Sequence, residues 1–226
     1  MKIIELDEVD STNEYCKRNY SGHSFVVTAA RQTGGRGTKG RSFSSENGGL
    51  YLSVVRKLFK AEATDAFLIM INACTAVCRT VEHYGLKPVI RWANDVLVNG
   101  KKICGTLIEN TFSGSFISRS IVGIGLNINN TLPGELLDIA TTLKQETGKE
   151  LPVREVRDLL LENLNKNFSL QDYKSYIDWF GKEVTVKTAA GEHIATAVDV
   201  DVDGRLICVL EGSLKKISSA EVSLEL

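Results

Sequence analysis

The dipeptide Asn99-Gly100 constrains the fold of this chain more than any other short stretch of its sequence. It stands between two strand-like segments, VLV and KKICGTLIE, and Asn-Gly is the pair that two-residue β-hairpins prefer. A second hairpin is predicted between residues 102–110 and 116–128, with its turn at residues 113–115. Because hairpins pair their strands antiparallel, the middle of the chain is predicted to form a mainly antiparallel sheet.

Helices and further strands are predicted on both sides of these hairpins. Ser11 and Glu14 have the spacing of a capping box, which predicts a short helix that ends near Tyr20. Residues 62–84 carry apolar side chains with a helical period. Further helices are predicted at about 134–147 and 152–178, and further strands at 24–30 and 50–55.

The pattern changes near residue 180, where short strands follow one another with glycine-containing turns between them. The strands are predicted at residues 182–188, 193–201, 205–210, 214–217 and 220–225. So many short strands in one small segment are typical of a closed or half-closed barrel. The chain is therefore predicted to form an α/β domain at residues 1–178, with a mixed, mainly antiparallel sheet and flanking helices, and a small barrel at residues 179–226.

The charge balance excludes a protein whose whole surface binds nucleic acid or anionic lipid, because 27 basic and 28 acidic residues leave a net charge of −1. The longest apolar stretch, residues 66–78, is shorter than the roughly 20 residues of a membrane span. The N-terminal segment carries acids where a signal peptide is apolar. We therefore expect a cytoplasmic protein without a membrane segment, whose 5 cysteines are reduced thiols.

Residues 31–43, RQTGGRGTKGRSF, combine basic side chains with glycines and contain no acid. Glycines let backbone amides approach an anion closely and the cations neutralise it, so the segment is typical of a phosphate or carboxylate site. The spacing Gly35-x-Gly37-x-x-Gly40 matches a dinucleotide fingerprint, but no helix pattern follows it, so we reject that interpretation. A nucleic-acid-binding segment and an ordinary solvated loop remain alternatives.

The segment RWANDVLVNGKKICG places Asp95 and Lys102 on the two arms of the first hairpin, where they can line one site. An Asp can hold Mg²⁺ beside phosphates, and a Lys can stabilise charge that develops at phosphorus. Lys101 is an equal candidate by composition, but alternation along a strand allows only one of the two lysines to face inward. A surface salt bridge beside a solvated lysine is the plain alternative.

The segment VGIGLNIN contains Gly123 and Gly125, which indicate that a ligand or another backbone approaches this strand closely. Asn127 is predicted on the same face, where its amide could bind a base or ring. A tightly packed central strand explains the segment equally well.

The order of these motifs resembles that of the biotin protein ligases. It begins with Ser11-Thr12-Asn13, continues with Gln32 and GRG-K-GR at residues 35–41, and then has RWANDV at residues 91–96. Lys102 with Gly105, the segment VGIGLNIN and a C-terminal AEVSL at residues 220–224 complete it. The resemblance covers nearly the whole chain. It implies a class II synthetase-like catalytic domain at residues 1–178 and an SH3-like barrel at residues 179–226.

The same resemblance implies ATP-dependent attachment of biotin to a lysine of a biotin carboxyl carrier protein, through biotinyl-5′-AMP and with Mg²⁺. It implies catalytic roles for Lys102 and Arg36, and it places Mg²⁺ at Asp95. The residues that it implies for biotin are Ser11, Thr12, Asn13, Gln32, Arg36, Gly37, Thr38, Lys102, Gly105 and Gly123. The residues that it implies for ATP and the adenylate are Arg36, Lys39, Arg41, Phe43, Trp92, Asn94, Lys102 and Asn127.

Several positions depart from the family pattern. Thr38 stands where some relatives have a second Arg, so the loop is expected to hold the adenylate less tightly unless another cation compensates. Ala93 replaces the proline of the usual KWPND, which softens a turn, and Phe43 stands where a Trp is common. Glu225 replaces an Arg, so a phosphate contact from that position is not expected.

Two other classes of function fit these residues less well. Lipoate ligases and octanoyltransferases belong to the same superfamily, but their motifs are not recognised here. A non-catalytic nucleic-acid binder conflicts with the neutral charge and with the pairing of Asp95 and Lys102. Because the chain begins directly before the Ser-Thr-Asn helix, we expect no DNA binding. Exposed strand edges could pair two copies of the chain, so a homodimer is a possible assembly.

Overall fold

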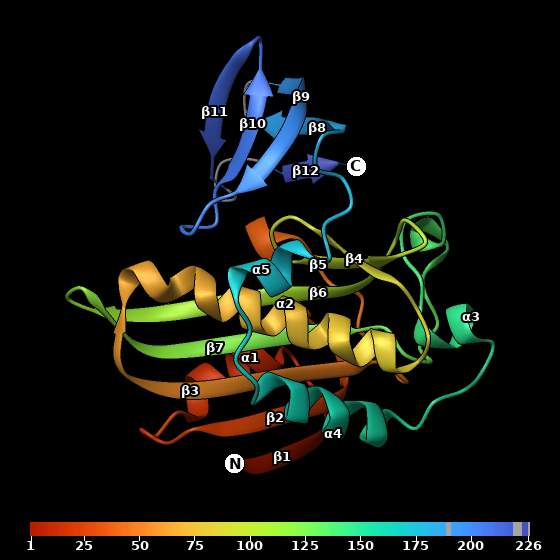
Figure 1. Ribbon diagram of the computed structural model, residues 1–226. Helices are drawn as coiled ribbons and strands as arrows, with labels where there is room; N and C mark the ends of the chain where they lie inside the picture. Colours follow the sequence, from red (N-terminus) through yellow and green to blue (C-terminus); the bar gives the residue numbers. More distant parts are fainter. Residues whose placement is uncertain (189–190, 219–222, 226) are drawn as a thin grey trace.

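The central layer of the protein is a seven-stranded sheet in the order β1-β2-β3-β7-β6-β5-β4. The computed structural model describes residues 1–188, 191–218 and 223–225, with the side chains of residues 59, 60, 188 and 223–225 left out (Figure 1). β1 and β2 pair in parallel, and the other neighbours in this sheet pair antiparallel. The strands are β1 (Lys2–Val9), β2 (Phe25–Gln32), β3 (Leu50–Glu62), β4 (Pro88–Arg91), β5 (Asp95–Val98), β6 (Lys101–Ser113) and β7 (Phe116–Leu126).

The C-terminal part forms a second, five-stranded antiparallel sheet in the order β11-β10-β9-β8-β12. Its strands are β8 (Glu183–Thr188), β9 (Gly191–Val200), β10 (Leu206–Leu210), β11 (Ser213–Ile217) and β12 (Ser223–Glu225). The predicted fold class is confirmed, and all five predicted strands are found. Within the described ranges, β11 and β12 are the sheet's two edges, so hydrogen bonds do not close this barrel there. Residues 220–222 of the C-terminal motif and the Glu225 side chain lie outside the described part.

Helices cover both faces of the large sheet (Figure 1). On one face lies α1 (Thr12–Asn19), which packs on β2, β3 and β7. On the other lie α2 (Ala66–His83) and α4 (Val153–Leu164), which pack on each other, and the short α5 (Leu170–Lys174). The shorter helical segments are η1 (Thr38–Gly40), η2 (Ala63–Asp65), η3 (Gly134–Leu136) and α3 (Leu143–Thr147).

Helix α2 is the core helix of the large domain. Ile71, Cys74 and Val77 are on its buried face, as their helical period predicts. Counted from residue 63 to residue 83, this helix is long and apolar enough to cross a membrane by length and composition, so the argument from a short apolar stretch does not apply to it. Half of the 18-residue apolar window of this helix is buried inside the fold.

Three local predictions differ from the structure. Ser11 precedes α1, but its side chain forms no capping hydrogen bond, its amide donates to Asp10, and Glu14 pairs with Lys17 and Arg36. The helix predicted at 134–147 is two short pieces, η3 and α3. The helix predicted at 152–178 ends at Leu164 and resumes only as α5. The strands β1 and β4 were not predicted from the sequence.

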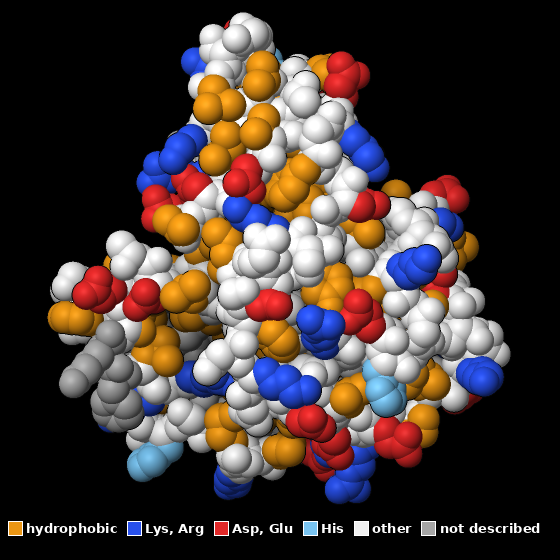
Figure 2. Space-filling view, viewed as in Figure 1, with side chains coloured by type: hydrophobic (Ala, Val, Ile, Leu, Met, Phe, Trp, Pro, Cys, Tyr) orange, Lys and Arg blue, Asp and Glu red, His pale blue; other side chains and the backbone are white. Residues whose placement is uncertain are grey.

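The two sheets are joined by packing around Gly204. The Trp92 indole nitrogen donates to the Gly204 carbonyl at 3.0 Å. A Cβ on Gly204 would lie 2.4 Å from the Phe67 ring, so only glycine fits there. Figure 2 shows basic and acidic side chains interspersed over this face of the molecule, in line with the net charge of −1.

Candidate active site

The candidate site lies on the face of the sheet that carries α1. There Ser53 of β3 lies opposite Gly123 of β7, and its hydroxyl oxygen is 2.7 Å from Thr12 Oγ1 and 2.6 Å from Asn13 Oδ1. The Gln32 side-chain oxygen accepts from the Thr12 backbone amide at 2.8 Å and from its hydroxyl at 3.1 Å. These neutral hydrogen-bonding groups are largely buried and bonded to one another, which fixes their orientation.

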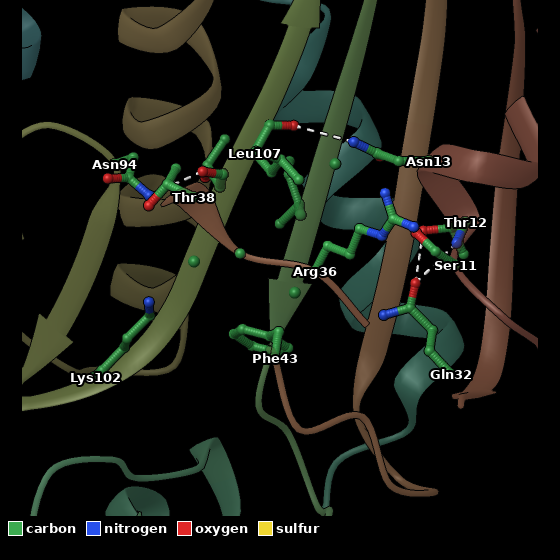
Figure 3. Close-up of a pocket in the computed structure, with 16 residues that line it drawn as sticks. Ser11, Thr12, Asn13, Gln32, Arg36, Thr38, Phe43, Asn94, Lys102 and Leu107 are labelled. Atoms are coloured by element: carbon green, nitrogen blue, oxygen red, sulfur yellow. Dashed lines mark hydrogen bonds between the residues drawn. The ribbon is translucent and has the colours of Figure 1, made fainter. Parts of the chain in front are cut away.

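A cavity begins at these groups and extends to Lys102 on β6. Figure 3 shows Lys102 on one side and Ser11, Thr12 and Gln32 on the other, with Arg36 and Phe43 between them. The cavity is lined by all ten residues that the motifs assign to biotin, and also by Phe43, Asn94, Thr106, Leu107, Ile124 and Gly125. Its free volume is about 40 Å³, room for only a few waters. A larger ligand therefore enters only if the lining moves.

Side chains of the protein itself occupy the space beside the glycines of β6 and β7. A Cβ on Gly123 would lie 2.4 Å from Asn13 Oδ1, and one on Gly125 would lie 2.5 Å from the Phe43 ring. A Cβ on Gly105 would be 3.1 Å from Lys102 Nζ. Gly123 and Gly125 are therefore approached closely by the side chains of Asn13 and Phe43, where the sequence predicted a ligand or another backbone, and Gly105 is approached by Lys102.

The basic loop folds back on itself over the cavity. Arg36 and Ser42 form an antiparallel bridge, and the Gly37 amide donates to the Arg41 carbonyl at 2.7 Å. Arg36 forms an ion pair with Glu14 of α1 at 2.9 Å. The hydrogen bond from Lys17 lowers the pKa of Glu14, and the Arg36 charge lowers it further. The loop is therefore attached to α1 through a carboxylate that is ionised at neutral pH.

Asp95 and Lys102 form an ion pair, as the hairpin predicts, with Nζ 2.6 Å from Oδ1. Arg91 contacts the other carboxylate oxygen at 2.8 Å. The Asn99-Gly100 turn pairs Leu97 with Lys102, which puts the lysine on the same face as Asp95. Both lysine and carboxylate are mostly buried, so their positions are well defined.

A β-bulge in β6 completes this arrangement. The pairing shifts by one residue between Val96 and Leu97, so that Gly105 rather than Cys104 lies opposite Asp95. Lys102 and Gly105 are three positions apart and would alternate to opposite faces in a regular strand. The bulge puts both beside the same cavity.

The choice between the two lysines is resolved by their contacts. Lys101 Nζ donates to the Leu137 carbonyl outside the cavity, at 2.7 Å. Lys102 lines the cavity, and its Nζ lies 5.8 Å from the centre of the Phe43 ring. The expectation that only one of them faces inward is confirmed.

A second cavity lies on the other side of Lys102 and Phe43, with a volume of about 500 Å³. Basic side chains predominate among its charged lining residues: Arg41, Arg91, Lys102 and Lys187, against the single acid Asp95. Asn127, Leu132, Leu136, Ile139 and Ala140 supply a mostly apolar wall. Such a combination suits a ligand with several negative charges and a flat apolar part.

Some predicted nucleotide-binding residues lie elsewhere or are already engaged. Trp92 lines neither cavity, because it is buried in the contact between the two sheets. Lys39 also lines neither. Asn94 lines the first cavity rather than the second and donates to the Thr106 carbonyl at 2.9 Å. Asn127 lines the second cavity, but its amide already donates to the Thr141 carbonyl and accepts from Asn130.

Asp95 is the residue predicted for Mg²⁺, and its carboxylate is neutralised by two cations in this structure. Among the described residues there is no cluster of three or more His, Cys, Asp or Glu side chains that could hold a metal ion. A single carboxylate fits Mg²⁺ only when phosphates and waters supply the other ligands. The donor set therefore suits a cation that arrives already bound to a polyphosphate.

Several residues of the site had no prediction. Arg91 and Lys187 add positive charge to the second cavity, and Glu14 holds Arg36. Ser53 touches both Thr12 and Asn13. A lone serine in the otherwise apolar segment LYLSVV is a signal that could have identified Ser53. Lys187 has no such signal, because only the packing of the second sheet brings it to this cavity.

Comparisons with known proteins cover both parts of the chain. Residues 6–127 match the Biotin/lipoate A/B protein ligase family, and residues 180–225 match the biotin protein ligase C-terminal domain. The bifunctional ligase/repressor BirA of Bacillus spizizenii is 30% identical over 243 residues, which cover 98% of this chain and 74% of that protein. The biotin–[acetyl-CoA-carboxylase] ligase of Paracoccus denitrificans is 26% identical, covering 96% and 98% of the two chains.

The fold has the same relatives. The structure of the biotin protein ligase from Aquifex aeolicus in complex with biotin and ATP superposes with a TM-score of 0.80 at 29% identity. The superposition covers 99% of this chain and 98% of that one.

Proposed function

Since the chain belongs to the biotin protein ligase family, we propose that it attaches biotin to a lysine of a biotin carboxyl carrier protein through biotinyl-5′-AMP. The observation that carries the proposal is the position of Lys102. This lysine lines both the cavity of neutral hydrogen-bonding groups and the cavity of basic groups. A carboxylate held in the first and a phosphate held in the second would meet at its ammonium group.

The first cavity is proposed as the biotin site. The buried Thr12 and Asn13 and the partly buried Gln32 provide hydroxyl and amide donors and acceptors suited to a cyclic urea. They are already held in place by Ser53 and by one another, so little order is lost when a ligand binds. Arg36, Gly37 and Thr38 come from the loop, whose movement would open the small cavity.

The second cavity is proposed as the ATP site. Arg41, Arg91 and Lys187 supply positive charge for the phosphates, and the apolar wall suits the adenine ring. Positions 38 and 225, where some relatives have an arginine, are Thr and Glu in this chain. The positive charges of Lys187 and Arg91 would compensate for the two missing arginines. We propose that Mg²⁺ arrives with ATP and that Asp95 meets it once Lys102 or Arg91 turns to a phosphate.

In the first step the biotin carboxylate attacks the α-phosphorus of ATP, an oxygen–phosphorus bond forms, and pyrophosphate leaves. Lys102 would hold the two repelling anions together and stabilise the charge that develops on the α-phosphate oxygens. Arg36 would add a second positive charge when it leaves Glu14. Asp95 positions Lys102 through their ion pair.

In the second step the amine of the carrier lysine attacks the carbonyl carbon of the adenylate, an amide forms, and AMP leaves. The loop over the cavity would exclude water from the hydrolysable anhydride until the carrier arrives. We further propose a cytoplasmic location, where carrier and ATP are available. Absence of DNA binding and formation of a homodimer stay predictions.

Pyrophosphate exchange into ATP, measured with biotin, lipoate and octanoate in turn, tests the proposal. We expect exchange with biotin alone, followed by transfer of biotin to a carrier domain. Exchange with lipoate or octanoate in place of biotin would assign the chain to the other branch of its superfamily. No exchange with any of the three acids would refute the proposed reaction.

A further inference from the structure

A separate cavity of about 310 Å³ lies between the large sheet and its layer of helices. Its floor is formed by β3 and β7, its roof by α2, and one wall by the segment that follows α4 (Figure 1). The residues that line it are Val54, Arg56, Leu58, Ala61, Asp65, Leu68, Ile69, Asn72, Ala73, Ser120, Val122, Leu164, Asn167 and Phe168. The volume is within the range of small-molecule sites.

This cavity is on the opposite face of the sheet from the candidate active site. Ser53 and Gly123 point to the active-site face, and their neighbours Val54 and Val122 point to the other. The two cavities share no lining residue. A ligand bound between the sheet and α2 would therefore not compete for space with biotin or ATP, since this cavity also shares no lining residue with the proposed ATP site.

The floor of the cavity holds a cation that lacks an acidic partner. Arg56 forms no ion pair with any side chain in the described part of the chain, whereas Arg91 and Lys102 of the same sheet both pair with Asp95. Its Nη2 donates to the Leu164 carbonyl at 2.8 Å. Partial burial lowers the pKa of Arg56, and removing a charge from water without an opposite charge is costly.

Two neutral polar groups beside Arg56 also lack partners. Ser120 lies directly opposite Arg56 in the sheet, is 1% exposed, and its hydroxyl has no hydrogen-bond partner. On α2, the Asn72 amide nitrogen donates to the Leu164 carbonyl, while its buried oxygen has no partner. Buried polar groups in native proteins are almost always satisfied, so such a group signals a missing ligand or water.

A purely structural role accounts for only part of this arrangement. Leu164 is the last residue of α4, and its carbonyl accepts from both Arg56 and Asn72, which stabilises the end of that helix. That role uses one donor of each side chain. The remaining guanidinium donors of Arg56, the Ser120 hydroxyl and the Asn72 oxygen are therefore available to hydrogen-bond a ligand or water in the cavity.

We propose that this cavity binds a small monocarboxylate with an aliphatic body. The carboxylate would accept from Arg56 and from the Ser120 hydroxyl, and the body would lie along Val54, Val122 and Ile69. A water beside the head group would satisfy the Asn72 oxygen. Asp65 is also in the lining and its carboxylate accepts from the Glu62 amide, so the anionic head is directed to the Arg56 end.

The test is isothermal titration calorimetry of the full chain with hexanoate, in the presence of saturating biotin and ATP so that the active site is filled. We expect saturable binding, with hexan-1-ol and hexylamine at least tenfold weaker because they lack the anion. Arg56→Met is expected to weaken hexanoate binding at least tenfold, and Ser120→Ala about threefold. Lys57→Met, on the same strand but outside the cavity, is the matched control and should leave binding unchanged.

Arg56→Met also removes a contact to α4, so thermal unfolding of each variant is measured. If that variant does not fold, Ala73→Leu, which fills the cavity from α2, serves instead and must abolish binding. The proposal is overturned if hexanoate does not bind, if it binds equally to the Ala73→Leu protein, or if hexan-1-ol binds as tightly as hexanoate. Because the readout is binding and not adenylation, failure of this site would leave the proposed ligase reaction untouched.

Discussion

Replacing Lys102 by alanine tests the role on which the proposed reaction depends. Lys102 Nζ lies 2.6 Å from Asp95 and lines both cavities, so it is the group placed to meet developing charge at the α-phosphate. Removing one preorganised donor of this kind costs about 2.7–4 kcal/mol in the transition state, or roughly 10²–10³ in rate. We therefore expect Lys102→Ala to lower biotin-dependent pyrophosphate exchange by about that factor.

The structure also limits what the substitution does to stability. Asp95 retains its contact with Arg91 when Lys102 is lost, so the carboxylate is not left without a cation. We expect a loss of about 1 kcal/mol in the free energy of unfolding, well below the 3–5 kcal/mol of a fully broken buried pair. Thermal unfolding measured beside the exchange assay separates the two effects.

Lys101→Ala is the matched control, because Lys101 is the adjacent residue and its ammonium contacts only a carbonyl outside the cavity. Its exchange rate should stay within about threefold of the parent protein, since an exposed contact contributes little. Equal losses in both variants would refute the assignment of the inward-facing lysine. An unimpaired Lys102→Ala protein would refute the role of its charge.

Three further predictions concern other parts of the molecule. Gly123→Ala places a Cβ 2.4 Å from Asn13 Oδ1, so the KM for biotin should rise about tenfold, whereas Gly134→Ala, in open space, should not change it. The two hydrogen bonds that Arg18 donates lower the pKa of Asp10 from 3.8 to about 2. The ion pair therefore stabilises the fold above pH 3.8, and this stabilisation is lost as the pH falls to about 2. Arg18→Met should therefore lower the urea midpoint of unfolding slightly at neutral pH and leave it unchanged at the acid end of a pH series, and an equal shift at both ends would contradict this. All 5 cysteines are buried and burial raises the pKa of Cys16 and Cys74 to about 12, so thiol reagents should label them only after unfolding; labelling of the native protein would contradict this.

Local sequence determined the elements whose hydrogen bonds close within a few residues. Asn99 and Gly100 both adopt positive φ, which is why this pair predicts the hairpin and the position of Lys102 opposite Leu97. The small β-domain was predicted for the same reason, since Gly191, Gly204 and Gly212 mark the turns between its first four predicted strands. Ser11 shows where local signals fail: its capping box did not form, because its amide donates to Asp10 while Glu14 pairs with Lys17 and Arg36.

Only the tertiary structure decided which distant groups meet. Gly105 shares a face with Lys102 because β6 carries a bulge, and no residue type announces it. Trp92, expected near the nucleotide, is instead buried against Gly204, and Lys187 reaches the second cavity from the other sheet. The sequence by itself determined the turns and the alternation of faces within the regular stretches of the predicted strands, because alternation and turn chemistry are local. Registers, bulges and contacts between the sheets depend on packing summed over the whole chain, so they became visible only in the folded protein.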